Sequence, residues 1–440
     1  MLPDGRQILA RLPRAPEYQV AYSGGVDSHV LLFILAGVRE QLPGELVAVH
    51  VNHGIQQASG DWEVHCRAIC EQLGVRFRCI QVQGRAGRGE SPEAVARAAR
   101  YRGLAQSLPA DAVLLTAQHR DDQAETLLLQ LFRGAGVRGL ASMPEQMPFG
   151  QGQLLRPFLF SSRKEIVACA RQHRLCWVVD PANRDLRYDR NFVRHQLLPQ
   201  LQQRWPAVAH TLSRAAAHQA DQVELAAVVA EMDYAHCRGR AGHGLQVDQV
   251  RLLSVARQRN LLRFWIEHNG LSLPSRAVIE RILEELLESD GGSSPLVHWP
   301  HAEVRRYRNC LYAMAPPPAH VVEQIFCWAP EFPLSLENAG GELTASREQG
   351  AGLVLPDVGQ ITIRFRQGGE QLQPAGRQHH HRLKKLLQEW GVPPWERNRI
   401  PLVYVGDTLV AVAGLCVTEG FHAGADETGW LLRWSRRSAW

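Results

Sequence analysis

A buried strand, a glycine turn and a helix follow one another directly near the start of this chain. The strand segment is EYQVA (17–21), the turn is SGGVDS (23–28), and the helical segment is HVLLFILAGVREQL (29–42). Glycines permit unusual φ angles and close backbone approach, and a helix N-terminus favours negative charge. The pattern predicts an anion-binding turn. The alternative is a tight turn in which Asp27 or Ser28 only caps the helix.

Strands and helices alternate from residue 17 to about 135. Each apolar run ends in polar residues, as expected for a buried parallel strand followed by a helix. This alternation predicts an α/β fold with a doubly wound parallel sheet and a site at the carboxyl ends of its strands. Three groups fall at such ends and would line one crevice: the turn 23–28, Asn52-His53 and Gln118-His119.

The rest of the chain has a different pattern. Helical periodicity begins after about residue 185 and continues through 248–290, which predicts a mainly α middle domain. A Pro-rich linker follows at MAPPPAH (314–320), and short β-rich pieces then surround one basic helix, HHHRLKKLLQEWG (379–391). A small α+β domain would close the chain. The predicted domains are 1–212, 213–316 and 317–440.

Composition indicates a globular protein that does not enter a membrane. Hydrophobic residues make up 45% of the 440 and charged residues 21%. No stretch approaches the ~18 consecutive apolar residues needed to span a bilayer, and we expect a cytoplasmic location. The nine cysteines are scattered without any C-x-x-C, which suits free thiols in a reducing compartment. Cys66 and Cys70 share a helix face, where buried packing is favoured over metal binding.

Arginine and lysine are clustered although the net charge is only +5. The clusters lie at 84–102, 183–195 and 377–385, with aromatic residues nearby. Each cluster alone is typical of a solvated helix face. Three together favour a polyanionic partner. The three histidines at 379–381 are a weak metal site, because neighbouring side chains on a helix point in different directions.

The turn has no lysine, unlike the G-x-x-x-x-G-K-[ST] loop that supports γ-phosphoryl transfer. It resembles the loop of the PP-loop ATP pyrophosphatases instead. That resemblance implies that the loop grips the β/γ pyrophosphate and leaves the α-phosphate open to attack, with ATP split into AMP and pyrophosphate. The implied ATP-binding residues are Ser23, Gly24, Gly25, Val26, Asp27 and Ser28, and Asp27 would help to hold Mg²⁺.

Further motifs narrow the resemblance. HVNHGI (50–55), SPEAVARAARYR (91–102), TAQHRDDQAETLLLQLFRGAGVRGL (116–140), RPFLFSSRKEI (156–166) and DPANRDLRYDRNFVRHQLLPQL (180–201) occur in this order. The set is similar to the tRNA(Ile)-lysidine synthase family, and the segment from 364 to 407 resembles its C-terminal domain. Two departures are visible: Gln118-His119 stands where the family often has His-His, and Ser91-Pro92-Glu93 where it often has Asn-x-Glu.

The resemblance implies a specific reaction. ATP would activate C2 of the wobble cytidine in a CAU-anticodon tRNA(Ile), giving an adenylated intermediate. The ε-amine of free L-lysine would then attack, yielding lysidine and AMP, so that the tRNA reads AUA instead of AUG. Dimers occur in the family, and the sequence itself does not give the oligomeric state.

The reaction assigns roles to particular side chains. Positive charge is needed where the transition state develops negative charge at the α-phosphate, and carboxylates must orient an ammonium. Acids three and four apart share one helical face, although an acidic first turn also suits a helix dipole. The assignments are Arg97 and Arg100 for the α-phosphate, Asp122 and Glu125 for lysine, His53 and His119 for a proton relay, and Asp121 as a further metal ligand. Contacts with tRNA are assigned to Arg187, Arg190, Asn191, Arg194, Arg382, Lys384 and Lys385.

Three other functions stay open at this point. A PP-loop tRNA 2-thiolase shares the loop and the RNA partner, but its sulfur relay usually needs paired cysteines. An ammonia-using ligase such as NAD synthetase would have little use for the region beyond 210. A non-enzymatic tRNA-binding protein would need neither the loop nor the acids. Sulfur dependence, independence of RNA and absence of ATP turnover would identify them, respectively.

Overall fold

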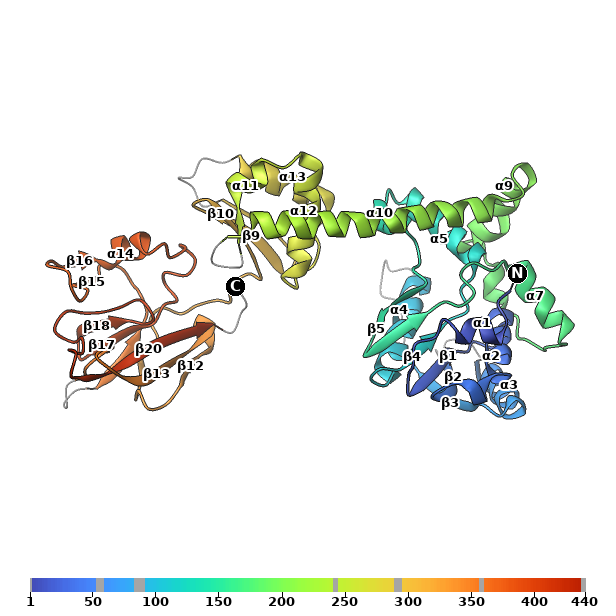
Figure 1. Cartoon of the computed structure of the whole chain (residues 1–440), viewed down its shortest axis with the longest axis horizontal. Coiled ribbons are helices and arrows are strands. Elements are labelled where there is room, and N and C mark those ends of the chain that lie inside the picture. The colour runs from blue at the N-terminus through green and yellow to red at the C-terminus, as the bar shows by residue number, and fades with distance from the viewer. Residues whose placement is uncertain are drawn as a thin grey trace. The chain divides into compact units, whose positions relative to one another are not determined.

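The computed structural model describes residues 2–52, 59–82, 92–239, 244–288, 295–355 and 360–436 (Figure 1). The chain forms two compact units, Met1–Leu225 and Ala226–Trp440. Among the described residues, no helix combines the length and the apolar character that crossing a bilayer requires. His53, one of the predicted relay residues, lies outside the described residues.

The first unit is built on a six-stranded sheet with the order β3-β2-β1-β4-β6-β5. All neighbours are parallel except the edge hairpin of β5 and β6. The prediction of a doubly wound parallel sheet is therefore confirmed. The direction of winding changes between β1 and β4, the kind of place where such sheets bind ligands. The strands are β1 (Glu17–Ala21), β2 (Glu45–Asn52), β3 (Arg76–Gln81), β4 (Val113–Leu115), β5 (Gln146–Phe149) and β6 (Gly152–Leu155).

Side-chain alternation along these strands produces two cores. Leu46 and Ala48 of β2 point to the face that α1, α2, α3 and α7 cover, whereas Val47 and Val49 point to the face covered by α4. Both faces are buried, so the strands read as continuous apolar runs in the sequence. The covering helices are α1 (Gly5–Leu9), α2 (Val26–Ala36), α3 (Ser59–Leu73), α4 (Pro92–Ser107) and α7 (Arg163–Gln172).

A group of helices packs beside the carboxyl edge of this sheet. Ala124 and Leu128 of α5 contact Val193, Leu198 and other apolar residues of this group. The contact brings the segment 189–204 next to α5 although some 65 residues separate them in sequence. The helices are α5 (Arg120–Phe132), α6 (Val137–Leu140), α8 (Asp189–Phe192), the π-helix η3 (Val193–Leu197), α9 (Leu198–Arg204) and α10 (Val208–Cys237), with the short 3-10 turn η2 (Pro181–Arg184). Another 3-10 turn, η1 (Arg39–Gln41), lies between α2 and β2.

The second unit contains a four-stranded antiparallel sheet that the sequence analysis did not name. Its order is β7-β10-β9-β8, and it packs on the expected helices. The strands are only two to six residues long, and β9 carries Glu303, Arg305 and Arg306, so the pattern of apolar runs does not mark this sheet in the sequence. The elements are β7 (Leu245–Gln246), α11 (Val247–Arg251), α12 (Val255–His268), α13 (Arg276–Arg281), the π-helix η4 (Ile282–Leu287), β8 (Leu296–Trp299), β9 (Ala302–Tyr307) and β10 (Cys310–Met314).

The C-terminal part of the second unit has small antiparallel sheets around one short helix, as predicted for an α+β domain. The helix is shorter than expected: α14 covers Leu383–Glu389, and His381 lies in a strand. The predicted boundary at 212 falls inside α10, and the three-domain division stays a prediction. The elements are β11 (Phe326–Cys327), β12 (Leu334–Leu336), η5 (Glu337–Ala339), β13 (Gly341–Gln349), β14 (Ile361–Arg364), β15 (Gln371–Leu372), β16 (His381–Arg382), β17 (Leu402–Val405), β18 (Thr408–Val412), β19 (Cys416–Val417) and β20 (Thr428–Arg436).

Candidate active site

The glycine turn forms a compact loop between β1 and α2. The backbone N–H of Ser23 donates to Ser28 Oγ (3.2 Å), and Ser28 Oγ donates to the carbonyl of Gly25 (3.1 Å). Gly25 is the N-cap of α2 and offers no side chain to cap the first turn. The Gly25 N–H donates to Ser23 Oγ (3.3 Å), but within the described part of the chain no side chain caps the first turn of α2, as an anion site requires.

Gly24 is required at its position for two reasons. Its φ is +82°, a left-handed conformation that L-residues rarely adopt. A Cβ at this position would also lie 2.9 Å from the buried Cys66 Sγ. The Gly24 carbonyl accepts a hydrogen bond from the Val178 N–H (2.9 Å). The loop is thus fixed from behind by α3 and by the segment that leads to α8.

A buried histidine connects this loop to α5. His119 is only 1% exposed, and its Nδ1 accepts the N–H of Asp122 (3.3 Å) as the N-cap of α5. Nε2 therefore carries the proton in the neutral ring. This nitrogen faces Asp122 Oδ2 at 3.3 Å and Asp27 Oδ1 at 3.8 Å. The predicted ATP loop and the predicted lysine-binding acids consequently each place a carboxylate near the same nitrogen of one imidazole.

Asp122 and Glu125 are already paired with two arginines. Arg194 donates from Nε to Glu125 Oε1 (2.6 Å) and from Nη2 to Asp122 Oδ1 (2.7 Å). Arg190 donates from Nε to Glu125 Oε2 (2.9 Å) and from Nη2 to Asp122 Oδ1 (3.3 Å). The arrangement places two positive charges opposite two carboxylates, of which Glu125 is 1% exposed.

These contacts shift the acid–base behaviour of the site. Burial alone would raise the pKa of Asp122, but the charges of His119, Arg190 and Arg194 outweigh it and lower that pKa. The pKa of Arg194 is raised: burial opposes its charge, and Glu125 and Asp122 more than compensate. Asp122 is therefore ionised at physiological pH, and both acids are already paired with guanidinium groups, with which an ammonium would have to compete.

Asp27 has the opposite environment. Burial raises its pKa, partly offset by the charge of His119, and Asp122 raises it further. Its Oδ1 accepts no hydrogen bond within the described part of the chain. An unsatisfied buried carboxylate oxygen beside a phosphate loop fits a cation that also contacts phosphates, which is how Mg²⁺ is commonly held. No group of three or more His, Cys, Asp or Glu that could hold a metal occurs among the described residues.

The other predicted residues of the first unit take different positions. Asp121 Oδ2 accepts the Arg163 N–H (2.9 Å) at the start of α7. Arg97 and Arg100 are exposed on α4, and the guanidinium carbon of Arg97 lies 5.0 Å from the centre of the Tyr101 ring. Burial lowers the pKa of His50, and the charge of Arg100 lowers it further. Arg100 therefore lies near the end of β2.

The predicted tRNA contacts of the first unit are mostly engaged within it. Besides Arg190 and Arg194, Asn191 is buried and its Nδ2 donates to the carbonyls of Ala182 (2.9 Å) and Asp185 (3.0 Å). Arg187 is exposed and pairs with Asp185 (2.6 Å). A tRNA contact by Arg190, Asn191 or Arg194 would require an exchange of these bonds.

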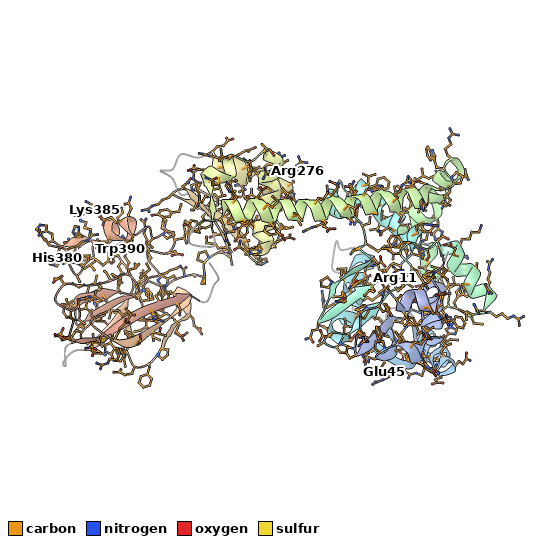
Figure 2. All side chains as sticks on the ribbon, in the orientation of Figure 1. Arg11, Glu45, Arg276, His380, Lys385 and Trp390 are labelled. Carbon is orange, nitrogen blue, oxygen red and sulfur yellow. The ribbon has the colours of Figure 1, made fainter. Side chains whose placement is uncertain are left out.

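The C-terminal basic residues have free access to solvent. Arg382, Lys384 and Lys385 are exposed around α14. Figure 2 shows His380 and Lys385 on the outside of this part of the chain, whereas Trp390 packs partly against its core. A polyanion could approach them without displacing an internal contact.

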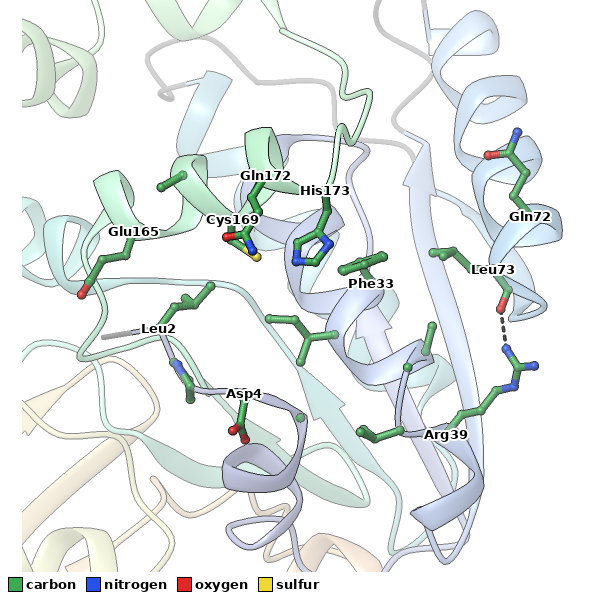
Figure 3. A pocket seen from close by; sticks show the side chains of 17 residues that line it. Leu2, Asp4, Phe33, Arg39, Gln72, Leu73, Glu165, Cys169, Gln172 and His173 are labelled. Atoms are coloured by element: carbon green, nitrogen blue, oxygen red, sulfur yellow. Dashed lines mark hydrogen bonds between the residues drawn. The ribbon is translucent and has the colours of Figure 1, made fainter.

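An open cavity of about 800 Å³ lies on another side of the first unit (Figure 3). Phe33, Val38, Cys169 and His173 are among its lining residues, and they come from the last turn of α2 and beyond it and from α7. The glycine loop is at the opposite end of α2. The cavity is therefore separate from the predicted ATP site.

Spacing in the sequence did not reveal two of these contacts, the arginine pairs and Cys66 behind Gly24, and the sequence analysis did not name Tyr101 although it follows Arg97 by four residues on one helix. The partners are 65 to 72 residues apart in the arginine pairs. One signal was present, because Arg190 and Arg194 are four apart on one helical run and match acids three apart on another.

Three family models match this chain. The model for a PP-loop domain matches residues 6–201, the TilS substrate binding domain matches 245–312, and the TilS substrate C-terminal domain matches 361–434. The tRNA(Ile)-lysidine synthase of Coxiella burnetii is 41% identical over 425 residues, which cover 96% of this chain and 94% of that protein. The protein of the same name from Methylococcus capsulatus is 45% identical over 414 residues, covering 93% and 94%.

A third relative with this name, from Serratia proteamaculans, is 41% identical over 436 residues and covers 98% of both chains. Similarity at this level over nearly the whole length leaves no domain of the chain unaccounted for. It includes the glycine loop and the acids that the structure brings together around His119. The chain belongs to the tRNA(Ile)-lysidine synthase family, ATP-dependent ligases built on a PP-loop domain.

Proposed function

We propose that this protein ligates L-lysine to C2 of the wobble cytidine of tRNA(Ile) with the CAU anticodon. One observation carries the proposal: His119 Nε2 lies between Asp27 of the phosphate loop (3.8 Å) and Asp122 of the acid pair (3.3 Å). A site for ATP and a site for an ammonium group therefore share one buried residue. Bringing both reactants to one edge of the sheet is what an adenylation followed by amine attack requires.

The proposed first step is adenylation. The C2 oxygen of cytidine attacks the α-phosphorus of ATP, and the bond from this phosphorus to the pyrophosphate oxygen breaks. Pyrophosphate leaves, and the tRNA then carries AMP on the C2 oxygen of the cytidine. The loop 23–28 would hold the β- and γ-phosphates through backbone N–H groups, and Asp27 would hold Mg²⁺. Arg97 and Arg100 are proposed to stabilise the charge that develops at the α-phosphate.

The proposed second step forms lysidine. The ε-amine of lysine, after losing a proton, attacks C2; the bond from C2 to the oxygen breaks, and AMP leaves with that oxygen. Asp122 and Glu125 are proposed to bind lysine by taking over bonds now made to Arg190 and Arg194. A proton relay through His119 would require Nδ1 to release the Asp122 N–H, and His53 is the second proposed relay group.

The remaining assignments follow from the family resemblance. We propose on this basis that the modified tRNA reads AUA instead of AUG and that the protein is cytoplasmic. We also propose that the tRNA contacts the segment 187–194 and the basic residues Arg382, Lys384 and Lys385. A homodimer is a further proposal, and the molar mass in solution tests it. The exposed basic residues around α14 support the tRNA contact, because each lysine that neutralises a phosphate strengthens binding.

The test is AMP and pyrophosphate release from ATP with tRNA(Ile), with and without labelled L-lysine. We expect AMP release with incorporation of lysine into the tRNA. AMP release without lysine incorporation, together with a dependence on a sulfur donor, would replace the proposal with a tRNA thiolase. Tight tRNA binding without any nucleotide turnover would leave an RNA-binding protein.

A further inference from the structure

Tyr101 joins the end of β4 to the exposed arginine of α4. Gln118 Nε2 donates to the Tyr101 hydroxyl at 3.0 Å, and Thr116 Oγ1 donates to Gln118 Oε1. The guanidinium carbon of Arg97 lies 5.0 Å from the centre of the Tyr101 ring, within the range of a cation–π contact. The other side of the network is apolar, because Tyr101 meets the Phe149 ring edge-on with the centroids 5.9 Å apart.

The network fixes the direction of each member. Since Gln118 Oε1 accepts the Thr116 hydroxyl, its amide nitrogen must be the atom that faces Tyr101. Thr116 is 5% exposed and follows β4 directly, so the network starts from a rigid part of the sheet. Gln118 stands where the family often has histidine, and its amide gives this chain a donor and an acceptor with fixed places.

The surroundings also concentrate positive charge at this point. The buried Arg156 interacts with Tyr101, and the charge of Arg97 contributes to lowering the pKa of Arg156, after the larger effect of burial. Arg156 donates from Nη1 to the Pro144 carbonyl (2.6 Å). Two guanidinium groups therefore gather near one tyrosine at the carboxyl end of β4, the strand next to the one that carries the phosphate loop.

We propose that Tyr101 is a positioning residue that, with Gln118, holds Arg97 ready for the α-phosphate of ATP during adenylation. This inference rests on the proposed function. An exposed arginine on a helix has many rotamers, and it loses this freedom when its guanidinium binds the transition state in a single rotamer. A ring held from behind limits that freedom beforehand, so the charge is in place when the reaction needs it. Tyr101 acts through Arg97 and does not itself contact ATP.

The alternative is that Tyr101 only fills the core beneath α4, where it packs with Leu104 and Phe149. A filling role and a positioning role differ in one measurable way. A core residue affects folding whether or not Arg97 is present. A positioning residue affects the chemical step only while Arg97 is present.

The experiment is a double-mutant cycle on AMP formation with the full chain, tRNA(Ile) and L-lysine. We expect Tyr101→Leu to lower kcat about tenfold with little change in the KM for ATP, because the lost contact acts mainly in the transition state. In the Arg97→Ala background, the same substitution should have no further effect on kcat. Tyr101→Phe, which keeps the ring and loses the hydroxyl, should lower kcat less than Tyr101→Leu does.

The first unit also offers a control variant for this experiment. Phe77→Leu removes another ring beneath an arginine, Arg67, at 4.9 Å and should leave kcat unchanged. An equal loss from Tyr101→Leu with and without Arg97, or no loss at all, would overturn the inference. If Tyr101→Leu does not fold, Tyr101→Phe and Gln118→Leu in both backgrounds decide the question in the same way. A wild-type chain that forms no AMP would instead remove the proposed function, and this inference with it.

Discussion

The phosphate loop and the acid pair face the same histidine, but they are prepared for their ligands in opposite ways. The loop is made of backbone, and its N–H groups at the start of α2 are not capped by a side chain. The acids Asp122 and Glu125 already hold two arginines through charged hydrogen bonds. From this comparison we expect ATP to enter a formed cradle, whereas lysine, at the site proposed for it, would have to displace cations. Four predictions test this contrast.

The largest effect is expected from Gly24→Ala. A left-handed φ costs an L-residue about 1–2 kcal/mol, and the new Cβ would press on Cys66 Sγ. We expect kcat/KM for ATP, measured by AMP formation, to fall by about 100-fold, since about 2.7 kcal/mol corresponds to that factor. The matched control is Gly60→Ala in α3, where a Cβ meets nothing within 4 Å. Unchanged ATP kinetics in Gly24→Ala would show that the cradle is not preformed.

The second effect separates the two halves of the site. Glu125→Gln removes one carboxylate, and each hydrogen bond to a charged group contributes about 1.5–3 kcal/mol. We expect kcat/KM for L-lysine to fall by about 100-fold while the KM for ATP changes little. Glu71→Gln, an exposed acid on α3, is the control and should change neither value. An equal rise of both KM values would mean that the acids support the loop and do not bind lysine.

The third prediction concerns the displaced cation. Arg194→Ala leaves the buried Glu125 with Arg190 alone, and breaking such a pair costs about 3 kcal/mol of folding stability. We expect a lower Tm, and a larger rise of Tm on addition of L-lysine than in the wild type, because an ammonium then fills a vacant place. Arg187→Ala, on an exposed pair, should leave Tm unchanged. A smaller lysine-induced rise than in the wild type would contradict competition between the cations.

The smallest effect concerns Asp27, the carboxylate that burial keeps from ionising easily. Because the folded-state pKa is raised above the unfolded one, ionised Asp27 destabilises the fold, and this cost develops as pH rises through the unfolded value of 3.8. Asp27→Asn should therefore raise Tm by a few degrees at most at pH 7 and not at pH 3. Affinity for Mg²⁺-ATP should fall at the same time. A lower Tm at pH 7 would show that Asp27 is stabilised without a ligand.

The sequence predicted correctly those features of the fold that depend on residues close together along the chain. The alternation of apolar runs predicted the parallel sheet, and the strand at 17–21 begins and ends as β1 does. The β-rich pieces near the C-terminus were predicted, but the sheet of β7 to β10 was missed, because its strands are short and β9 carries three charged residues. The three histidines were placed on a helix that begins only at Leu383, since a run of polar residues has no period to mark its start.

The same distinction holds for the active site. The sequence by itself determined the phosphate loop, because a glycine turn after a strand works through its own backbone over a few residues. It also determined which acids share a face of α5, since helical spacing is a local rule. Only the tertiary structure decided that Arg190 and Arg194 neutralise those acids, that His119 joins them to Asp27, and that Tyr101 contacts Gln118 at the end of β4. All three depend on the packing of segments that are not neighbours along one helix, which spacing along the chain does not encode.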